Sequence, residues 1–329
     1  MRFCFLLLSF FTAVACAADP ADAFRDWSAF GRLDLEKLAS GKVAKECNAS
    51  MKFPRGLTAQ AVYVVAAPPD AAVRLLIYSD PTKHAESETY QHRVFQDGAD
   101  AQFATLSLDP KVASVRRLLA AMPTGVGLQL SAEEAGKLPR AGSRTAAESF
   151  WAGLLRERWS QLASRGNWGR VRGYETRREL LSLLAEESRI ARHFSSLLAP
   201  VVSENLPSPP AASYWDVSGV NGTAAVALGV LYLRTEEARR QVLDVTYYSS
   251  GSYLTSLTLY ELIPVTLGGR SHTLVWQGCL VSAPALAGGF GVKRKIASVM
   301  TLNELEQSVK LFQQDAAAAR PNGRGELAQ

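Results

Sequence analysis

Four strand-like runs followed by one long amphipathic helix occupy the last third of the chain, and they constrain its fold most strongly. The runs cover about residues 223–234, 241–249, 253–263 and 272–282, and the helix covers about residues 292–314. Consecutive strands joined by short connections form an antiparallel meander. A helix of about 33 Å, at 1.5 Å per residue, can cross a whole sheet. This order predicts an α+β fold in which a curved antiparallel sheet wraps around the C-terminal helix.

The C-terminal helix carries apolar side chains at helical spacing, which predicts one buried stripe along its length. The segment Thr301-Leu302-Asn303-Glu304 also fits a capping box, so a second helix start within the stripe is an alternative. The stripe consists of Val292, Ile296, Val299, Leu302, Leu305, Val309 and Phe312.

Shorter elements precede the meander. Residues 57–66 are rich in Val, Ala and Tyr and predict a strand, and Pro69-Asp70 suits the first turn of a helix. Asp97-Gly98 predicts a hairpin turn between strands at residues 90–95 and 102–108.

A helical segment separates these elements from the meander. Ser131 and Glu134 form a capping-box pattern, and apolar residues recur at helical spacing in residues 148–165 and 176–198. We therefore expect a helical insertion at about residues 131–200, within an α+β domain that covers residues 57–314. A helical segment at residues 19–56 precedes this domain, and a flexible tail at residues 315–329 follows it.

Residues 1–18 have the pattern of a secretory signal peptide, with Arg2, an apolar core and small residues at the end. Plain cleavage is the main interpretation, and a lipid-anchored Cys16 is the alternative. No later segment has the 18 or more uninterrupted apolar residues of a transmembrane helix. The sequence therefore predicts an exported protein, periplasmic or secreted.

The charge of the chain is only mildly positive. Of its 36 basic side chains, Arg2 belongs to the signal peptide, and the remainder face 31 acidic ones. This balance does not favour nucleic-acid binding. Arginine is concentrated in residues 140–192, and this leaves an anionic envelope surface or an acidic protein as a partner beside the ordinary interpretation, a solvated helical face.

Two cysteines, Cys47 and Cys279, remain after the signal peptide. In an exported protein such a pair is typical of a disulfide, and we predict one here. Cys47 lies just before the first expected strand and Cys279 lies in the last, so the bridge requires these strands to be neighbours. Two free thiols are the alternative.

The sequence contains no Gly-x-Ser-x-Gly, His-Glu-x-x-His, phosphate-loop or paired Cys-x-x-Cys motif. His84, Glu88 and His92 would share one face of a helix, but His92 falls in an expected strand, where this spacing does not converge on a metal. We therefore predict neither a metal nor a cofactor. The glycines at 288, 289 and 291 could present backbone N–H groups to an anion, although a flexible corner is the simpler interpretation.

The segment Tyr63-Val64-Val65-Ala66-Ala67-Pro68-Pro69-Asp70, the meander, the glycine-rich corner and the final helix together resemble the START and polyketide-cyclase-like superfamily, which has a helix-grip fold. The resemblance covers residues 57–109 and 214–314, with the helical segment as an insertion. It implies that the first strand lies beside the last, which would bring Cys47 toward Cys279. It also implies that an apolar or amphipathic small molecule binds under the C-terminal helix.

We therefore predict an exported, non-catalytic binding protein for a hydrophobic or amphipathic, lipid-like molecule held between the meander and the helix. Arg234 is the expected anchor for an acidic head group. The two alternatives are an envelope interaction protein that uses the basic insertion, and an enzyme of unrecognised type. The expected lining residues are Tyr232, Tyr248, Tyr260 and Trp276.

Overall fold

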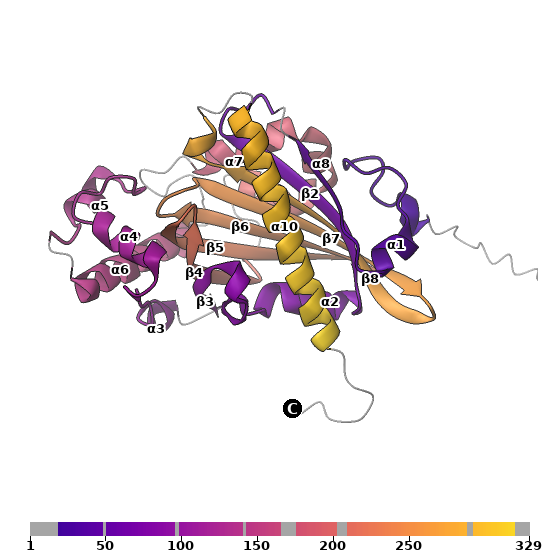
Figure 1. The fold of residues 1–329 in the computed structure, drawn as a ribbon, viewed down its shortest axis with the longest axis horizontal. Helices are drawn as coiled ribbons and strands as arrows, with labels where there is room; N and C mark the ends of the chain where they lie inside the picture. The colour runs from indigo at the N-terminus through magenta and orange to yellow at the C-terminus, as the bar shows by residue number, and fades with distance from the viewer. Residues whose placement is uncertain are drawn as a thin grey trace, which may run out of the picture.

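One antiparallel sheet of eight strands organises the protein (Figure 1). The computed structural model describes residues 19–48, 51–95, 99–140, 143–165, 176–202, 209–287 and 292–319. The expected signal peptide, the glycine-rich corner at 288–291 and most of the expected tail lie outside these residues. The strands are β1 (Ala44–Asn48), β2 (Gly56–Val65), β3 (Thr89–Phe95), β4 (Ala212–Val220), β5 (Thr223–Glu236), β6 (Arg239–Ser249), β7 (Thr255–Leu267) and β8 (Arg270–Ser282).

The predicted meander is present as β5 to β8, and each of these strands pairs antiparallel with the next. The full spatial order is β1-β2-β8-β7-β6-β5-β4-β3. β2 therefore lies beside β8, although more than 200 residues separate the two strands, while β3 and β4 extend the other side of the sheet. The predicted α+β class with an antiparallel sheet is confirmed.

The edge strand β1 is an addition that the sequence pattern did not predict. Its sequence, Ala-Lys-Glu-Cys-Asn, lacks the apolar alternation of a half-buried strand. The register places Cys47 opposite Ala59 of β2, and Ala59 opposite Cys279 of β8. One complete strand therefore separates the two cysteines.

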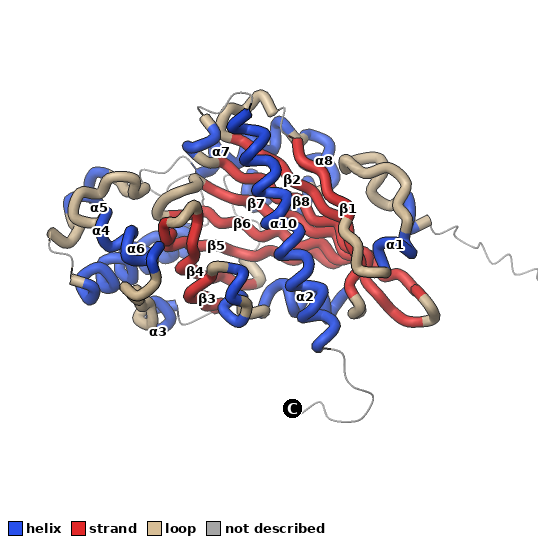
Figure 2. Tube along the Cα trace, in the orientation of Figure 1, coloured by secondary structure: helices blue, strands red, loops and turns tan. Residues whose placement is uncertain are grey.

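Different helices cover the two faces of the sheet (Figures 1 and 2). The long helix α10 (Val292–Ala318) crosses one face over β1 and β2, and α2 (Pro69–Tyr78) packs beside it. The helices between β3 and β4 cover the opposite face, together with residues of the N-terminal segment such as Trp27. We call these the α10 face and the insertion face. Successive side chains of each strand alternate between them.

The insertion face is a continuous apolar core, with strand residues such as Leu228, Leu243 and Trp276 fully buried. The predicted hairpin after β3 is wrong, because residues 102–108 are not a strand: α3 ends at residue 103, and residues 104–108 form a turn and a loop. The expected turn residues 97 and 98 lie outside the described part. Residues 176–198, expected as one helix, form three. The helical segment between β3 and β4 begins before residue 131, the expected start of the insertion, because α3 and α4 precede that residue. Its helices are α3 (Ala99–Phe103), α4 (Ala113–Ala121), α5 (Ala132–Gly136), α6 (Arg144–Arg165), α7 (Thr176–Glu186), α8 (Ser188–His193) and α9 (Ser195–Val202).

The start of α5 shows how the sequence fixes one of these helices. The Ser131 hydroxyl accepts a hydrogen bond from the Glu134 N–H at 3.2 Å, and the Glu134 carboxylate accepts one from the Ser131 N–H at 2.7 Å. The predicted capping box is confirmed. Glu134 also forms an ion pair at 2.8 Å with Arg158 of α6, so the cap is joined to the longest helix of the insertion.

The apolar stripe of α10 is buried along only part of the helix. Leu305, Val309 and Phe312 pack on the sheet and on α2, as predicted. In the first half, Ile296 and Val299 are exposed to 55% and 57%, which contradicts the prediction of one continuous buried stripe. The helix is nevertheless unbroken from residue 292 to 318, so Thr301 does not start a new helix. None of the described helices combines the length and the apolar character needed to cross a bilayer.

Candidate functional site

A cleft of about 360 Å³ lies between the first half of α10 and the sheet. It is in the region under the C-terminal helix where the ligand site was expected. Leu57, Val281, Leu286, Ala297 and Met300 provide much of its apolar wall. The polar lining residues include Ser256, Cys279, Arg294, Thr301 and Glu304.

The cleft exists because α10 does not cover the whole face. The helix packs on β1, β2 and α2, which leaves the strands further along the sheet partly uncovered. Burial along β7 shows this directly: Ser256, Thr258 and Tyr260 on the α10 face are half-buried, whereas the intervening Leu257 and Leu259 are fully buried. The α10 face of β7 is therefore accessible, and its insertion face is closed.

A row of polar side chains crosses the floor of the α10 face. Cys279 lies opposite Thr258 of β7, and Thr258 lies opposite Asp244 of β6. Directly paired residues on one face of an antiparallel sheet have their Cβ atoms about 5 Å apart. Since Cys279 lines the cleft and Asp244 is half-buried, the row connects the cleft with a carboxylate two strands away.

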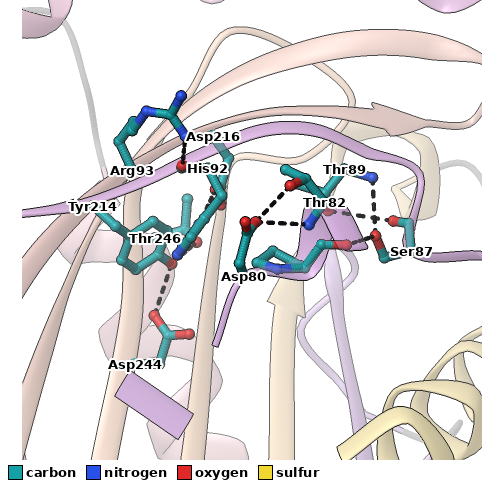
Figure 3. Close-up of polar contacts among 11 residues, drawn as sticks. Asp80, Thr82, Ser87, Thr89, His92, Arg93, Tyr214, Asp216, Asp244 and Thr246 are labelled. Atoms are coloured by element: carbon teal, nitrogen blue, oxygen red, sulfur yellow. Dashed lines mark hydrogen bonds and ion pairs between the residues drawn. The ribbon is translucent and has the colours of Figure 1, made fainter. Parts of the chain in front are cut away.

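Tyr214 holds this carboxylate in place (Figure 3). Its hydroxyl donates to Asp244 Oδ1 at 2.7 Å and lies 3.0 Å from Thr246 Oγ1. To reach β6 from β4, the tyrosine ring must lie across β5, where Gly229 provides the space. A Cβ atom at Gly229 would lie 2.2 Å from Tyr214 Cζ, so a side chain there excludes the ring.

A histidine–aspartate pair adjoins this cluster. His92 Nδ1 of β3 lies 2.5 Å from Asp216 Oδ1 of β4, and only 15% of the His92 side chain is exposed. The segment before β3 is fixed by its own polar contacts: Asp80 accepts hydrogen bonds from the Thr82 N–H and hydroxyl, and Ser87 accepts one from the Thr89 N–H (Figure 3).

These surroundings shift several pKa values. Burial raises the pKa of Asp244 to about 7, which the hydrogen bond from Tyr214 opposes and the nearby Asp216 carboxylate reinforces. Burial disfavours the imidazolium of His92, but the hydrogen bond and charge of Asp216 outweigh this and raise the pKa of His92. Burial also raises the pKa of Cys279 to about 11, so its sulfur is a neutral thiol at physiological pH.

The five predicted ligand residues lie outside the cleft lining. Tyr232, Tyr248 and Trp276 belong to the insertion-face core. Tyr260 is on the α10 face, where its hydroxyl accepts a hydrogen bond from Gln277 at 3.4 Å. Arg234 donates to Gln241 and Glu236 within the β5–β6 ribbon. The structure therefore does not bring these residues together in one site.

The predicted Cys47–Cys279 disulfide is wrong, because both thiols are free. β2 lies between the strands that carry them. Two inter-strand steps span about 10 Å, whereas the Cα atoms of a disulfide are about 4.4 to 6.8 Å apart. The two thiols share the α10 face without being able to bond.

The His84, Glu88 and His92 side chains do not form a shared site. His84 Nε2 lies 3.1 Å from Asp315 of α10, while His92 pairs with Asp216. Glu88 ends the short turn before β3 in a left-handed conformation, with φ of 49°. Across the described residues, no group of three His, Cys, Asp or Glu side chains is placed to hold a metal ion.

Sequence reasoning missed Asp216, Asp244 and Tyr214. A signal was present at Asp244, which lies between Leu243 and Val245 in an otherwise apolar run. A carboxylate inside a strand of this kind must either face water or receive a hydrogen bond, since its burial alone is costly. Such positions are candidates for functional groups.

In comparisons with known proteins, no family model matches the chain and no curated protein matches it. The resemblance to the START and polyketide-cyclase-like superfamily therefore stays a prediction.

Proposed function

We propose that this is an exported binding protein for an amphipathic small molecule, held in the cleft beside α10. The cleft itself carries the proposal: an apolar wall and polar side chains such as Cys279, Arg294 and Glu304 meet in one partly enclosed space. Its volume of about 360 Å³ falls within the range of about 300 to 1,000 Å³ for small-molecule sites.

The cleft is lined by both apolar and polar side chains, and this supports an amphipathic ligand. Leu286, Ala297 and Met300 would contact the apolar part of the molecule. The row of Cys279, Thr258 and Asp244 leads away from this wall and would receive its polar part. Apolar contact then supplies most of the affinity, and the polar groups supply orientation.

We further propose that the fold is a variant of the helix grip. In support, β2 lies beside β8 and a C-terminal helix crosses the sheet. The edge strand β1 and the helices between β3 and β4 are additions to that arrangement. The proposed export rests on the pattern of residues 1–18.

The proposal is tested by filling the cleft. Ala297→Trp places an indole among the lining residues, whereas Ile296→Trp, one position away and exposed, serves as the matched control. The ligand probe is 1-octanol, and the readout is protection of Cys279 from maleimide, measured by peptide mass spectrometry.

We expect octanol to slow labelling of Cys279 in the wild type and in Ile296→Trp, but not in Ala297→Trp. Native mass spectrometry of the protein purified from its producing cell should also show a copurified molecule that is absent from Ala297→Trp. If octanol leaves the labelling rate of the wild type unchanged and nothing copurifies, the binding function is wrong.

A further inference from the structure

We infer that the polar row leading out of the cleft ends in a recognition site for a protonated amine, with Asp244, two strands beyond the lining residue Cys279, as its counter-ion. The inference rests on the proposed binding function and specifies the chemical class of the ligand.

The Asp244 carboxylate is held at one oxygen and available at the other. Tyr214 donates to Oδ1 at 2.7 Å, while among the described residues no hydrogen bond reaches Oδ2. The side chain is half-buried rather than closed off, so a ligand atom can approach it. A fixed carboxylate with a free oxygen is arranged to accept a hydrogen bond from outside the protein.

Among the described residues, no basic side chain forms an ion pair with Asp244. His92 is the nearby basic group, but it pairs with Asp216 at 2.5 Å. Arg294, across the cleft, donates to the backbone carbonyls of Gly56 and Phe53 at 2.6 and 3.4 Å. Glu304 adds a further carboxylate to the cleft lining. Arg294 keeps its positive charge, but it lines the cleft itself, whereas Asp244 lies beyond the lining. A cationic group that reaches the Asp244 end of the row would therefore be attracted by this carboxylate.

The surrounding groups suit an ammonium in particular. An ammonium has three N–H donors, and beside Asp244 the row offers a second acceptor, the half-buried Thr258 hydroxyl on the paired strand. A neutral alcohol could use the same acceptors but would not neutralise the carboxylate. The raised pKa of Asp244 agrees with a carboxyl group that lacks a cationic partner.

The test compares three probes with the same eight-carbon chain: octylammonium, 1-octanol and octanoate. Affinities are measured by titration calorimetry near pH 8, where Asp244 is largely ionised. We expect octylammonium to bind about tenfold or more tightly than octanol, the factor given by one charge-assisted hydrogen bond. Octanoate should bind more weakly than octanol.

Asp244→Asn should remove the preference for octylammonium over octanol, because asparagine keeps an acceptor for Tyr214 but carries no charge. Asp26→Asn, an exposed aspartate outside the cleft, should retain the preference. Tyr214→Phe should weaken octylammonium selectively, since Tyr214 positions the carboxylate without being its charge.

The ranking of the three probes in the wild type decides the inference even if a variant fails to fold. If octanol binds and octylammonium binds no more tightly, the amine site is wrong and the binding function stands. If Asp244→Asn folds and keeps the full preference, another group holds the amine and the assignment to Asp244 is wrong. If none of the three probes binds, the amine site is wrong, and if nothing copurifies with the protein either, the binding function fails as well.

Discussion

Ionisation of the Asp244 carboxyl group lowers the stability of the folded state relative to the unfolded chain. Its pKa of about 7 lies above the ordinary value of 3.8. Between these two values the native state keeps a proton that the unfolded chain has released, so the free energy of unfolding falls as the pH rises through this window. His92, whose pKa is also raised, contributes stability that is likewise lost as the pH rises. Only a variant can therefore isolate the contribution of Asp244.

We expect Asp244→Asn to gain stability relative to the wild type as the pH rises. Between pH 5 and pH 8 the difference in the free energy of unfolding should shift by about 1 to 2 kcal/mol in favour of the variant, less than the full pKa shift implies because the side chain is partly exposed. Urea denaturation of the ligand-free proteins at both pH values measures it. Asp26→Asn should show no such shift, and equal shifts in the two variants would contradict the prediction.

Gly229 controls whether Tyr214 can reach Asp244. In Gly229→Val the new side chain would occupy the position of the tyrosine ring, which must leave its hydrogen bonds to β6. We expect a loss of about 3 kcal/mol in unfolding free energy from overpacking and the broken hydrogen bond. Gly31→Val is the control, because a Cβ atom there has no neighbour within 4 Å. Similar losses in both variants would show that the ring does not cross β5.

At the scale of elements, α10 divides into a packed half and a half beside the cleft. We expect Leu305→Ala to cost about 2 to 4 kcal/mol, because it leaves a cavity between the helix and the sheet. Ile296→Ala, on the same helix but exposed, should change the stability by less than about 0.5 kcal/mol. Thermal and urea unfolding measure both. A comparable cost at Ile296 would mean that the first half of α10 is packed against the sheet.

The elements themselves were largely predictable from the sequence, but their pairing was not. Alternating β-branched and aromatic residues predicted β2 and β5 to β8 because their period of two is local information. Which face a side chain occupies depends on register, and one residue of slip reverses it. The bulge in β6, which pairs Leu228 with Tyr248 but Gly229 with Thr246, is such a change. Tyr247 and Tyr248 consequently both enter the insertion-face core.

The candidate site was predictable in location but not in composition. A cleft under the C-terminal helix follows from the order of strands and helix, whereas its residues depend on how far α10 covers the sheet. Large aromatic residues were expected to line it, but Tyr232 and Trp276 are needed to fill the space between the sheet and the insertion helices. The polar row comes from Asp244, Thr258 and Cys279, which lie on three strands and meet only through register.

At the scale of the molecule, the two faces of the sheet have different roles. The insertion face is closed by a continuous apolar core that includes Trp151, Trp215 and Trp276, and it supplies most of the packing. The α10 face carries the cleft and the carboxylates of Asp216 and Asp244. The half-buried carboxylates of Asp216 and Asp244 therefore lie on the face opposite the main core. Burial of these carboxylates is unfavourable, and the packed core on the other face of the sheet holds the strands that carry them in place.

The strand order also determines which cysteines lie close enough to form a disulfide. Because Ala59 lies directly opposite both Cys47 and Cys279, an antiparallel pair at this position has Cα atoms about 4.5 to 5.5 Å apart, which suits a disulfide. We expect the wild type to keep two free thiols under mild oxidation. The double variant Ala59→Cys with Cys47→Ser should instead form a bridge between residues 59 and 279, detected by non-reducing peptide mapping. Ala61→Cys in the same background, which faces Gln277, should remain reduced. A 47–279 bridge in the wild type would require β2 to leave its place between β1 and β8, and would overturn the order of the whole sheet.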